Sequence, residues 1–161
     1  MSNTLIQIDL KTQSLSLIRD GSVTFTAVIS SAKNGPGEIN GSEQTPRGWH
    51  QVRAKIGKDQ PVGAVFIGRR PTGEVFSEEL RDKNPARDWI LTRIMWLSGL
   101  EPGFNRLGHV DTMRRYIYIH GCPDSDILGA PGSHGCIKMR NSDVIRLFDL
   151  VDVGEQILIT E

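Results

Sequence analysis

The chain has 161 residues, a length that suits one domain with an ordinary hydrophobic core. Lysine plus arginine and aspartate plus glutamate both total 19, so no overall positive field would gather nucleic acid or an anionic membrane surface. We therefore expect a single domain over residues 1–161 and no nucleic acid partner.

The first ten residues, MSNTLIQIDL, lack the basic segment and following apolar segment of a secretory signal. The chain also has no run of eighteen apolar residues, so we expect no membrane segment. If Met1 is the natural start, these features predict a cytoplasmic protein whose thiols stay reduced. A disulfide between Cys122 and Cys136 is then the least favoured use of its two cysteines.

Strand signals come first along the chain. Ile6, Ile8 and Leu10 alternate with polar residues, as expected of a strand with one buried face. Asp20-Gly21 lies between two such alternating runs and favours a type I′ turn. Residues 5–30 are therefore predicted to form a β-meander.

A long loop and further strands follow. Asn34–Gly48 concentrates glycine, proline and polar residues without periodicity, and loops of this length in compact domains are often functional. The segment Trp89–Leu97 fits a helix or a strand, and its β-branched and aromatic content favours a strand. The other predicted strands are Trp49–Ile56, Gly63–Ile67, Glu74–Phe76, Tyr116–His120, Cys136–Met139 and Gln156–Thr160.

One helix is predicted near the C-terminus. The side chain of Asn141 can cap it, and apolar residues then recur at helical spacing, at Val144, Ile145, Leu147, Phe148 and Val151. The expected fold is mainly β, a sandwich or open barrel with one or two short helices.

The tripeptide His-Gly-Cys occurs twice, at residues 120–122 and 134–136. It could form a disulfide, a metal site, or a nucleophile with its base. Residues two apart on a strand project from one face, and histidine and cysteine both bind zinc. Structural zinc sites, however, space their ligands as Cys-x2-4-Cys and His-x3-5-His. The spacing disfavours a metal site, and we expect neither a metal nor a cofactor.

A cysteine nucleophile needs a base and backbone N–H groups that face an oxyanion. The sequence SHGC at 133–136 supplies the thiol of Cys136 and, through Gly135, a backbone that a substrate can approach closely. His120 would come from a neighbouring strand as the base. A free cysteine is also commonly a small hydrophobic residue of the core, so the residues alone leave that alternative open.

HG at 120–121, followed by SHGCIKMRN at 133–141, resembles the signature of the L,D-transpeptidase catalytic domain, also called the YkuD domain. The similarity extends to IQIDLKTQSLSLIRDG, NGPG, TPRGWHQV and VDVGEQILI, and so covers nearly the whole chain. The resemblance implies a β-rich domain that cleaves the bond before a terminal D-amino acid in a peptidoglycan stem peptide or muropeptide.

The resemblance also implies residue roles. Cys136 would attack the carbonyl of the L-centre of the third-position diamino acid and expel D-alanine, with His120 accepting and then returning the proton. Gly121 stands where some relatives have serine, so we expect a backbone carbonyl to orient the imidazole ring. The oxyanion backbone would be supported by Gly121, Ser133, His134 and Gly135, and the substrate would be bound by Lys138, Arg140 and Asn141.

Residues outside these motifs are given packing roles. We expect Cys122 to be packed or incidental, with reversible oxidation against Cys136 as an alternative. His50 is expected at the surface or in packing, and core packing is the first assumption for Trp89 and Trp96.

Three functions are compatible with these observations. The expected cytoplasmic location favours an L,D-carboxypeptidase that trims tetrapeptides to tripeptides during muropeptide recycling. The alternative is an exported, periplasmic L,D-transpeptidase that forms cross-links or exchanges D-amino acids. The third, a non-catalytic muropeptide-binding or metal-binding module, is disfavoured because Cys136 and His120 are both present.

Overall fold

The computed structural model describes residues 3–161, and these begin with a β-meander. Strands β1 (Thr4–Asp9), β2 (Ser14–Arg19) and β3 (Ser22–Ser30) pair antiparallel in succession. Between β2 and β3, Asp20 and Gly21 have φ angles of 51° and 80°, the positive values that a type I′ turn requires. The meander predicted over residues 5–30 is confirmed.

The later strands follow the predicted segments with shifted ends. The ambiguous segment before residue 100 is a strand, as predicted. The hairpin strand β6 begins at Arg70 instead of Glu74, because Arg70 and Pro71 pair with the preceding strand. Cys136 lies just before β9 and not within it. These strands are β4 (Gly48–Ile56), β5 (Ala64–Ile67), β6 (Arg70–Val75), β7 (Ile90–Gly99), β8 (Tyr118–Gly121), β9 (Ile137–Met139) and β10 (Gln156–Thr160).

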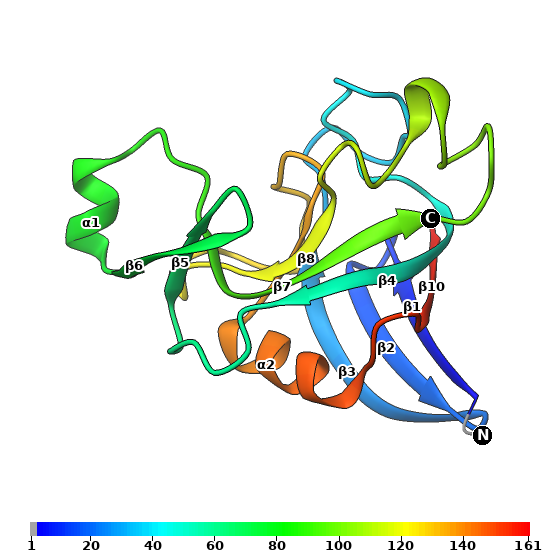
Figure 1. Cartoon of the computed structure of the whole chain (residues 1–161), viewed down its shortest axis with the longest axis horizontal. Helices are drawn as coiled ribbons and strands as arrows, with labels where there is room; N and C mark the ends of the chain where they lie inside the picture. The colour runs from blue at the N-terminus through cyan, green and yellow to red at the C-terminus, as the bar shows by residue number, and fades with distance from the viewer. Residues whose placement is uncertain (1–2) are drawn as a thin grey trace.

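A short helix, α1 (Glu78–Lys83), follows β6 and has no counterpart among the predicted elements. Ser77 caps it, since the Ser77 Oγ accepts a hydrogen bond from the Leu80 N–H at 3.0 Å. Together β5, β6 and α1 form an arm, residues 64–88, that projects from the rest of the molecule (Figure 1).

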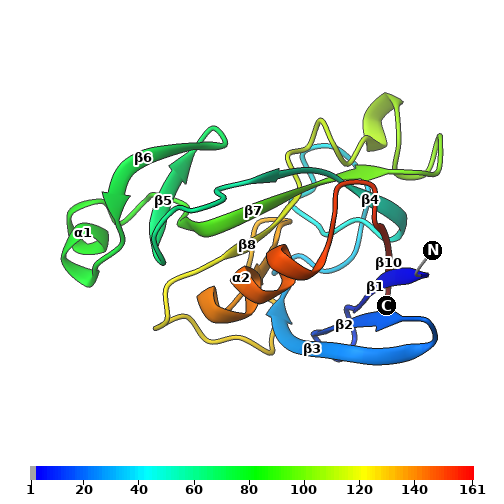
Figure 2. The same ribbon diagram turned by 60° about the horizontal axis from the view of Figure 1, so that its bottom comes forward.

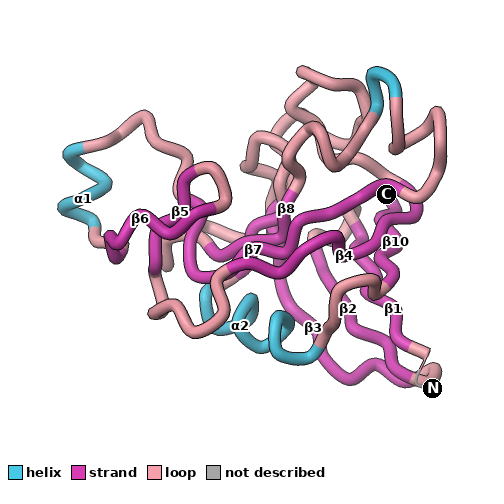
Figure 3. Tube along the Cα trace, in the orientation of Figure 1, coloured by secondary structure: helices cyan, strands magenta, loops and turns pink. Residues whose placement is uncertain are grey.

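The strands form one sheet that closes on itself. Its order is β4-β10-β1-β2-β3-β9-β8-β7-β5-β6, and β4 pairs again with β7. The eight strands other than β5 and β6 therefore make a complete ring, and Figure 3 shows far more strand than helix. The predicted mainly β fold is confirmed.

The main hydrophobic core lies inside this ring. Alternate residues of β1 and β2 point into it, among them Ile6 and Leu17, which are fully buried. Helix α2 (Asn141–Leu150) lies beside β7 and β8 (Figure 2) and adds Val144 and Leu147 to the same core. The apolar spacing predicted for this helix thus defines its buried face.

The start of α2 corrects one prediction. Arg140 occupies the N-cap position and makes no side-chain cap, while Asn141 is the first helical residue. The Asn141 side chain instead accepts a hydrogen bond from Thr92 Oγ1 at 2.6 Å and donates one to the Cys122 carbonyl at 2.9 Å. These two partners come from distant parts of the sequence, so local spacing could not reveal them.

Replacing Leu147 with alanine should lower the free energy of unfolding by about 3 kcal/mol, because the buried side chain leaves a cavity in the core. Thermal or urea unfolding would measure the loss. Arg146→Ala, at an exposed position of the same helix, is the control and should change stability by less than about 0.5 kcal/mol. Equal losses in both variants would show that α2 is not anchored through this face.

Candidate active site

The parallel pairing of β8 and β9 separates the core from a polar site. In this register Ile119 lies opposite Ile137, and His120 lies opposite Lys138. Because side chains alternate across a sheet, Ile119 and Ile137 enter the main core while His120 and Lys138 face the other side. Cys136 precedes Ile137 and shares the His120 side.

A cavity of about 460 Å³ lies on that side of the sheet. It brings Cys136 and His120 together with part of the arm and the segment before β8. Its lining residues are Gly68, Arg69, Asp88, Ile90, Arg115, Tyr116, Ile117, Tyr118, His120, Ser133, His134, Cys136 and Lys138.

The Cys136 thiol is half-buried and held by two backbone groups. Its Sγ accepts a hydrogen bond from the Tyr118 N–H at 3.3 Å and donates one to the Tyr116 carbonyl at 3.4 Å. Burial raises the pKa of the Cys136 thiol to about 12, and the Tyr118 N–H opposes this rise only in part. The resting sulfur is therefore a neutral thiol at pH 7.

His120 is buried, and its ring is oriented by a backbone carbonyl. Nδ1 lies 2.7 Å from the Gly121 oxygen. Because a carbonyl oxygen only accepts, Nδ1 carries the proton and Nε2 is the basic nitrogen. Burial lowers the pKa of His120, so the imidazole stays neutral and able to take a proton. The sequence predicts a carbonyl as the ring's partner, and Gly121 supplies it.

Gly121 has no room for a side chain. A Cβ at this position would lie 2.3 Å from Asn141 Oδ1 and 2.7 Å from the Leu91 carbonyl. The crowding comes from a β-bulge in β7, where Thr92 has a φ of 75°. The bulge and the Asn141 amide therefore fix the backbone that orients His120.

The segment before Cys136 is braced by the long loop at residues 34–48. The Ser133 Oγ donates to the Cys136 carbonyl and accepts from the Gly135 N–H at 3.2 Å. Thr45 Oγ1 in turn donates to the Gly135 carbonyl at 3.0 Å. Gly135 has a φ of 131°, a backbone conformation that residues with a side chain rarely adopt.

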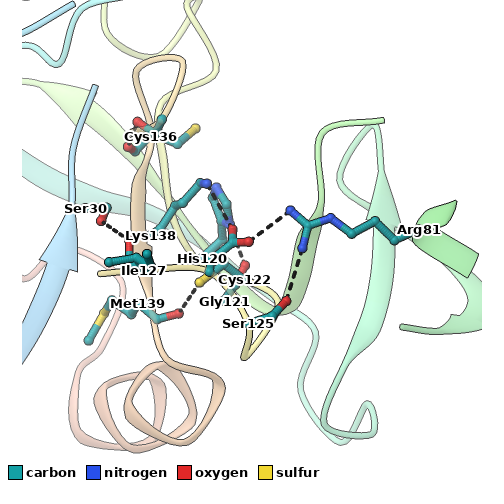
Figure 4. A network of polar contacts seen from close by, with 12 residues as sticks. Ser30, Arg81, His120, Gly121, Cys122, Ser125, Ile127, Cys136, Lys138 and Met139 are labelled. Carbon is teal, nitrogen blue, oxygen red and sulfur yellow. Dashed lines mark hydrogen bonds and ion pairs between the residues drawn. The ribbon is translucent and has the colours of Figure 1, made fainter. Parts of the chain in front are cut away.

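The other sequence-predicted residues divide between two places. His134 is exposed and lines the cavity. Lys138 also lines it, beside His120 (Figure 4), and its Nζ pairs with Asp126 Oδ2 at 3.2 Å. Arg140 borders a separate cavity of about 280 Å³. Asn141 is buried, and its side chain forms hydrogen bonds beside Gly121 and does not line the Cys136 cavity.

Cys122 is buried away from the cavity of Cys136. Its thiol donates to the Met139 carbonyl at 3.3 Å, and burial raises its pKa to about 11. Both cysteines are free. His50 is buried as well, bonded to the Gly48 carbonyl and Thr112, so it is a packing residue. Trp89 is buried in a small cluster under the arm, whereas Trp96 is partly buried beside the cavity wall.

Sequence reasoning missed the residues that the arm and the loops bring to the cavity. Arg69, Asp88 and Arg115 carry no motif, and each lies far in sequence from Cys136. A glycine followed by a charged residue at the hairpin turn, Gly68-Arg69, is the one local signal that pointed to an exposed position here.

Residues 3–161 hold no group of three or more His, Cys, Asp or Glu side chains arranged to bind a metal ion. Their helices are also all too short and too polar to cross a bilayer.

The chain belongs to the family of the L,D-transpeptidase catalytic domain, YkuD, whose model it matches over residues 3–159. YqjB of Bacillus subtilis (strain 168), described as a candidate L,D-transpeptidase, is 39% identical over 59 residues, which are 37% of this chain and 32% of YqjB. The chain thus spans about a third of that relative.

Solved structures share the fold. An L,D-transpeptidase from Mycobacterium smegmatis gives a TM-score of 0.58 at 20% identity, covering 99% of this chain and 59% of the other. L,D-transpeptidase 3 from Mycobacterium tuberculosis, in complex with a faropenem-derived adduct, gives 0.61 at 15% identity, covering 99% and 61%. The chain therefore spans about three fifths of these two proteins.

Alkylation of Cys136 by iodoacetamide should accelerate about tenfold per pH unit between pH 7 and 10, because only the thiolate reacts and the pKa of this thiol is raised to about 12. Mass spectrometry of the Cys136 peptide would give the rate. The variant Cys122→Ser removes the second thiol as a source of signal. A rate that levels off near pH 7 would instead reveal a preformed thiolate paired with a charged His120.

Proposed function

We propose that the chain is a cysteine acyl-transfer enzyme that cleaves peptidoglycan stem peptides before their terminal D-amino acid. One observation carries the proposal: His120 on β8 and Cys136, directly before the adjacent parallel strand β9, open onto the same cavity. Membership of the L,D-transpeptidase family supports peptidoglycan as the substrate class.

The neutral thiol and imidazole suit a proton transfer that accompanies attack. His120 Nε2 takes the proton as Cys136 Sγ bonds to the carbonyl carbon of the third residue. The tetrahedral intermediate then collapses to a thioester, and the imidazolium returns the proton to the departing amine of D-alanine. A raised thiol pKa and a lowered imidazole pKa both favour this neutral resting pair over an ion pair.

Backbone donors near Cys136 would stabilise the oxyanion. The Gly135 N–H is already bonded to Ser133 Oγ, so it serves to hold the loop. Cys136 lies outside β9, and within residues 3–161 its backbone N–H donates to no backbone carbonyl. That donor is therefore left for the substrate oxygen. Each such donor is worth about 3 to 4 kcal/mol of transition-state stabilisation.

The acceptor of the thioester decides between two named activities. Water gives an L,D-carboxypeptidase that shortens tetrapeptides to tripeptides, and this is the activity we propose, in cytoplasmic muropeptide recycling. An amine acceptor gives an L,D-transpeptidase, which is the second candidate because the family and its similar structures carry that name. A periplasmic location of the native protein would contradict the recycling role.

Replacing Cys136 with alanine should abolish D-alanine release from a disaccharide-tetrapeptide while the fold is kept, because no other side chain supplies the nucleophile. Cys122→Ser is the matched control and should retain nearly full turnover, since Cys122 lies outside the cavity. Mass spectrometry of the products and circular dichroism of each variant would check both points. Equal loss in the two variants would contradict the assignment of the nucleophile.

Adding D-methionine to the same reaction should leave the tripeptide as the main product if water is the preferred acceptor. Mass spectrometry would detect D-methionine exchanged into the fourth position. Exchange as the dominant product would contradict the carboxypeptidase and favour the transpeptidase. Absence of both products from the unaltered protein, with the substrate intact, would argue against the proposed function itself.

A further inference from the structure

Three cationic side chains line the cavity of Cys136, and two of them are already engaged. Arg115 donates through Nη2 to the Gln44 carbonyl and through Nη1 to the Gly37 carbonyl, and so ties the long loop to the site. Lys138 is paired with Asp126. The third cation, Arg69, is held differently.

Arg69 uses one of its five N–H donors, from Nη1 to the Tyr118 Oη at 2.9 Å. Its guanidinium lies over two aromatic rings, with Cζ 4.8 Å from the centre of Trp96 and 4.7 Å from that of Tyr116. Within residues 3–161 no carboxylate forms an ion pair with it, and Asp88, which lines the same cavity, lies beyond 4.0 Å.

The hairpin of the arm places this guanidinium. Gly68 and Arg69 form the two-residue turn between β5 and β6, with φ angles of 56° and 63°. An arginine in a left-handed conformation is uncommon, because its Cβ crowds the backbone. The turn is held against β7 and β8 by Trp96 and Tyr118, so the arm reaches the cavity through Arg69.

Tyr118 connects Arg69 to the nucleophile. Its hydroxyl accepts from Arg69, while its backbone N–H donates to Cys136 Sγ. One residue of β8 therefore contacts both the thiol and the guanidinium. Arg69 and Cys136 also line the same cavity, so a peptide bound at Cys136 would occupy a space that Arg69 borders.

We infer that Arg69 binds a carboxylate of the peptide substrate, an inference that rests on the proposed function. Stacking on ring faces leaves the edges of a guanidinium open, and a planar fork of donors matches a carboxylate. Two carboxylates flank the scissile bond when the third residue is a diamino dicarboxylic acid: that of the terminal D-amino acid and that of the third residue's side chain. Either would meet a cation that has no acid partner of its own.

A purely structural role is the competing explanation, since the stack also fastens the arm to the barrel. Arg53 provides the matched control. Its guanidinium lies over the same ring, 5.4 Å from the centre of Trp96, but borders a different cavity. Loss of Arg53 therefore removes a comparable contact without altering the wall of the Cys136 cavity.

The experiment measures kcat/KM for the wild-type protein, Arg69→Gln and Arg53→Gln on three substrates. One is the tetrapeptide with both of these carboxylates, one has lysine, which lacks a side-chain carboxylate, in place of the third-position diamino dicarboxylic acid, and one ends in a D-alanine amide. Arg69→Gln should lower kcat/KM on the first substrate by about tenfold or more, since it removes a charge-assisted contact. Arg53→Gln should leave it nearly unchanged.

The modified substrates identify the carboxylate. The substrate that lacks the carboxylate bound by Arg69 should react slowly with the wild-type protein, and Arg69→Gln should not lower its kcat/KM further. For the other modified substrate, Arg69→Gln should lower kcat/KM as much as it does for the parent tetrapeptide. Equal loss on all three substrates would overturn the inference and leave a structural role.

A binding measurement separates this inference from the proposed function. Calorimetric titration of the tetrapeptide into Cys136→Ala should give a Kd that weakens about tenfold or more when Arg69→Gln is added. Such weakening without any turnover by the unaltered protein would sink the proposed function and keep the inference. An unchanged Kd would overturn the inference even in an active enzyme. Adding Arg69→Lys, which keeps the charge and loses the fork, should give an intermediate Kd.

Discussion

The parallel register of β8 and β9 is the constraint on which the site depends. It sets His120 opposite Lys138 and places Cys136 directly before the adjoining strand β9. The same alternation sends Ile119 and Ile137 into the main core. A shift of one residue in either strand would exchange the two faces, so burial of the core and assembly of the site are specified by the same hydrogen bonds.

The pair itself is kept neutral by its surroundings. Burial disfavours both the thiolate of Cys136 and the imidazolium of His120, and no described carboxylate is bonded to the ring. Gly121 supplies the orienting carbonyl, which the Thr92 bulge and the Asn141 amide hold in place. Burial lowers the pKa of His120, and the hydrogen bond to the Gly121 carbonyl opposes that effect only in part.

Local patterns predicted the strands, because alternation and turn chemistry act within a few residues. The meander and β7 are examples of this. Cys136 and His120, in contrast, were singled out by the repeated His-Gly-Cys and by the resemblance to a family. Asn141 shows the limit: its position before an apolar run predicts a cap, yet contacts with Thr92 and the Cys122 carbonyl outweigh that local preference. The arm's contribution to the cavity could not be predicted either, since Arg69 reaches Tyr118 only once β5, β7 and β8 are paired.

The arm contributes lining residues to the Cys136 cavity that the strands of the barrel do not supply. Its hairpin turn meets the cavity through Arg69, while its helix meets the loop after β8 through Arg81. Arg81 donates to Ser125 Oγ at 3.2 Å (Figure 4) and pairs with Asp126 Oδ1 at 2.9 Å. Asp126 also holds Lys138, so the two cations share one carboxylate. One carboxylate offsets only part of the charge of Arg81 and Lys138, and Arg69 differs from both in having no ion pair with a carboxylate within residues 3–161. The charge that meets a substrate is thus set by how the arm docks as well as by the motif around Cys136.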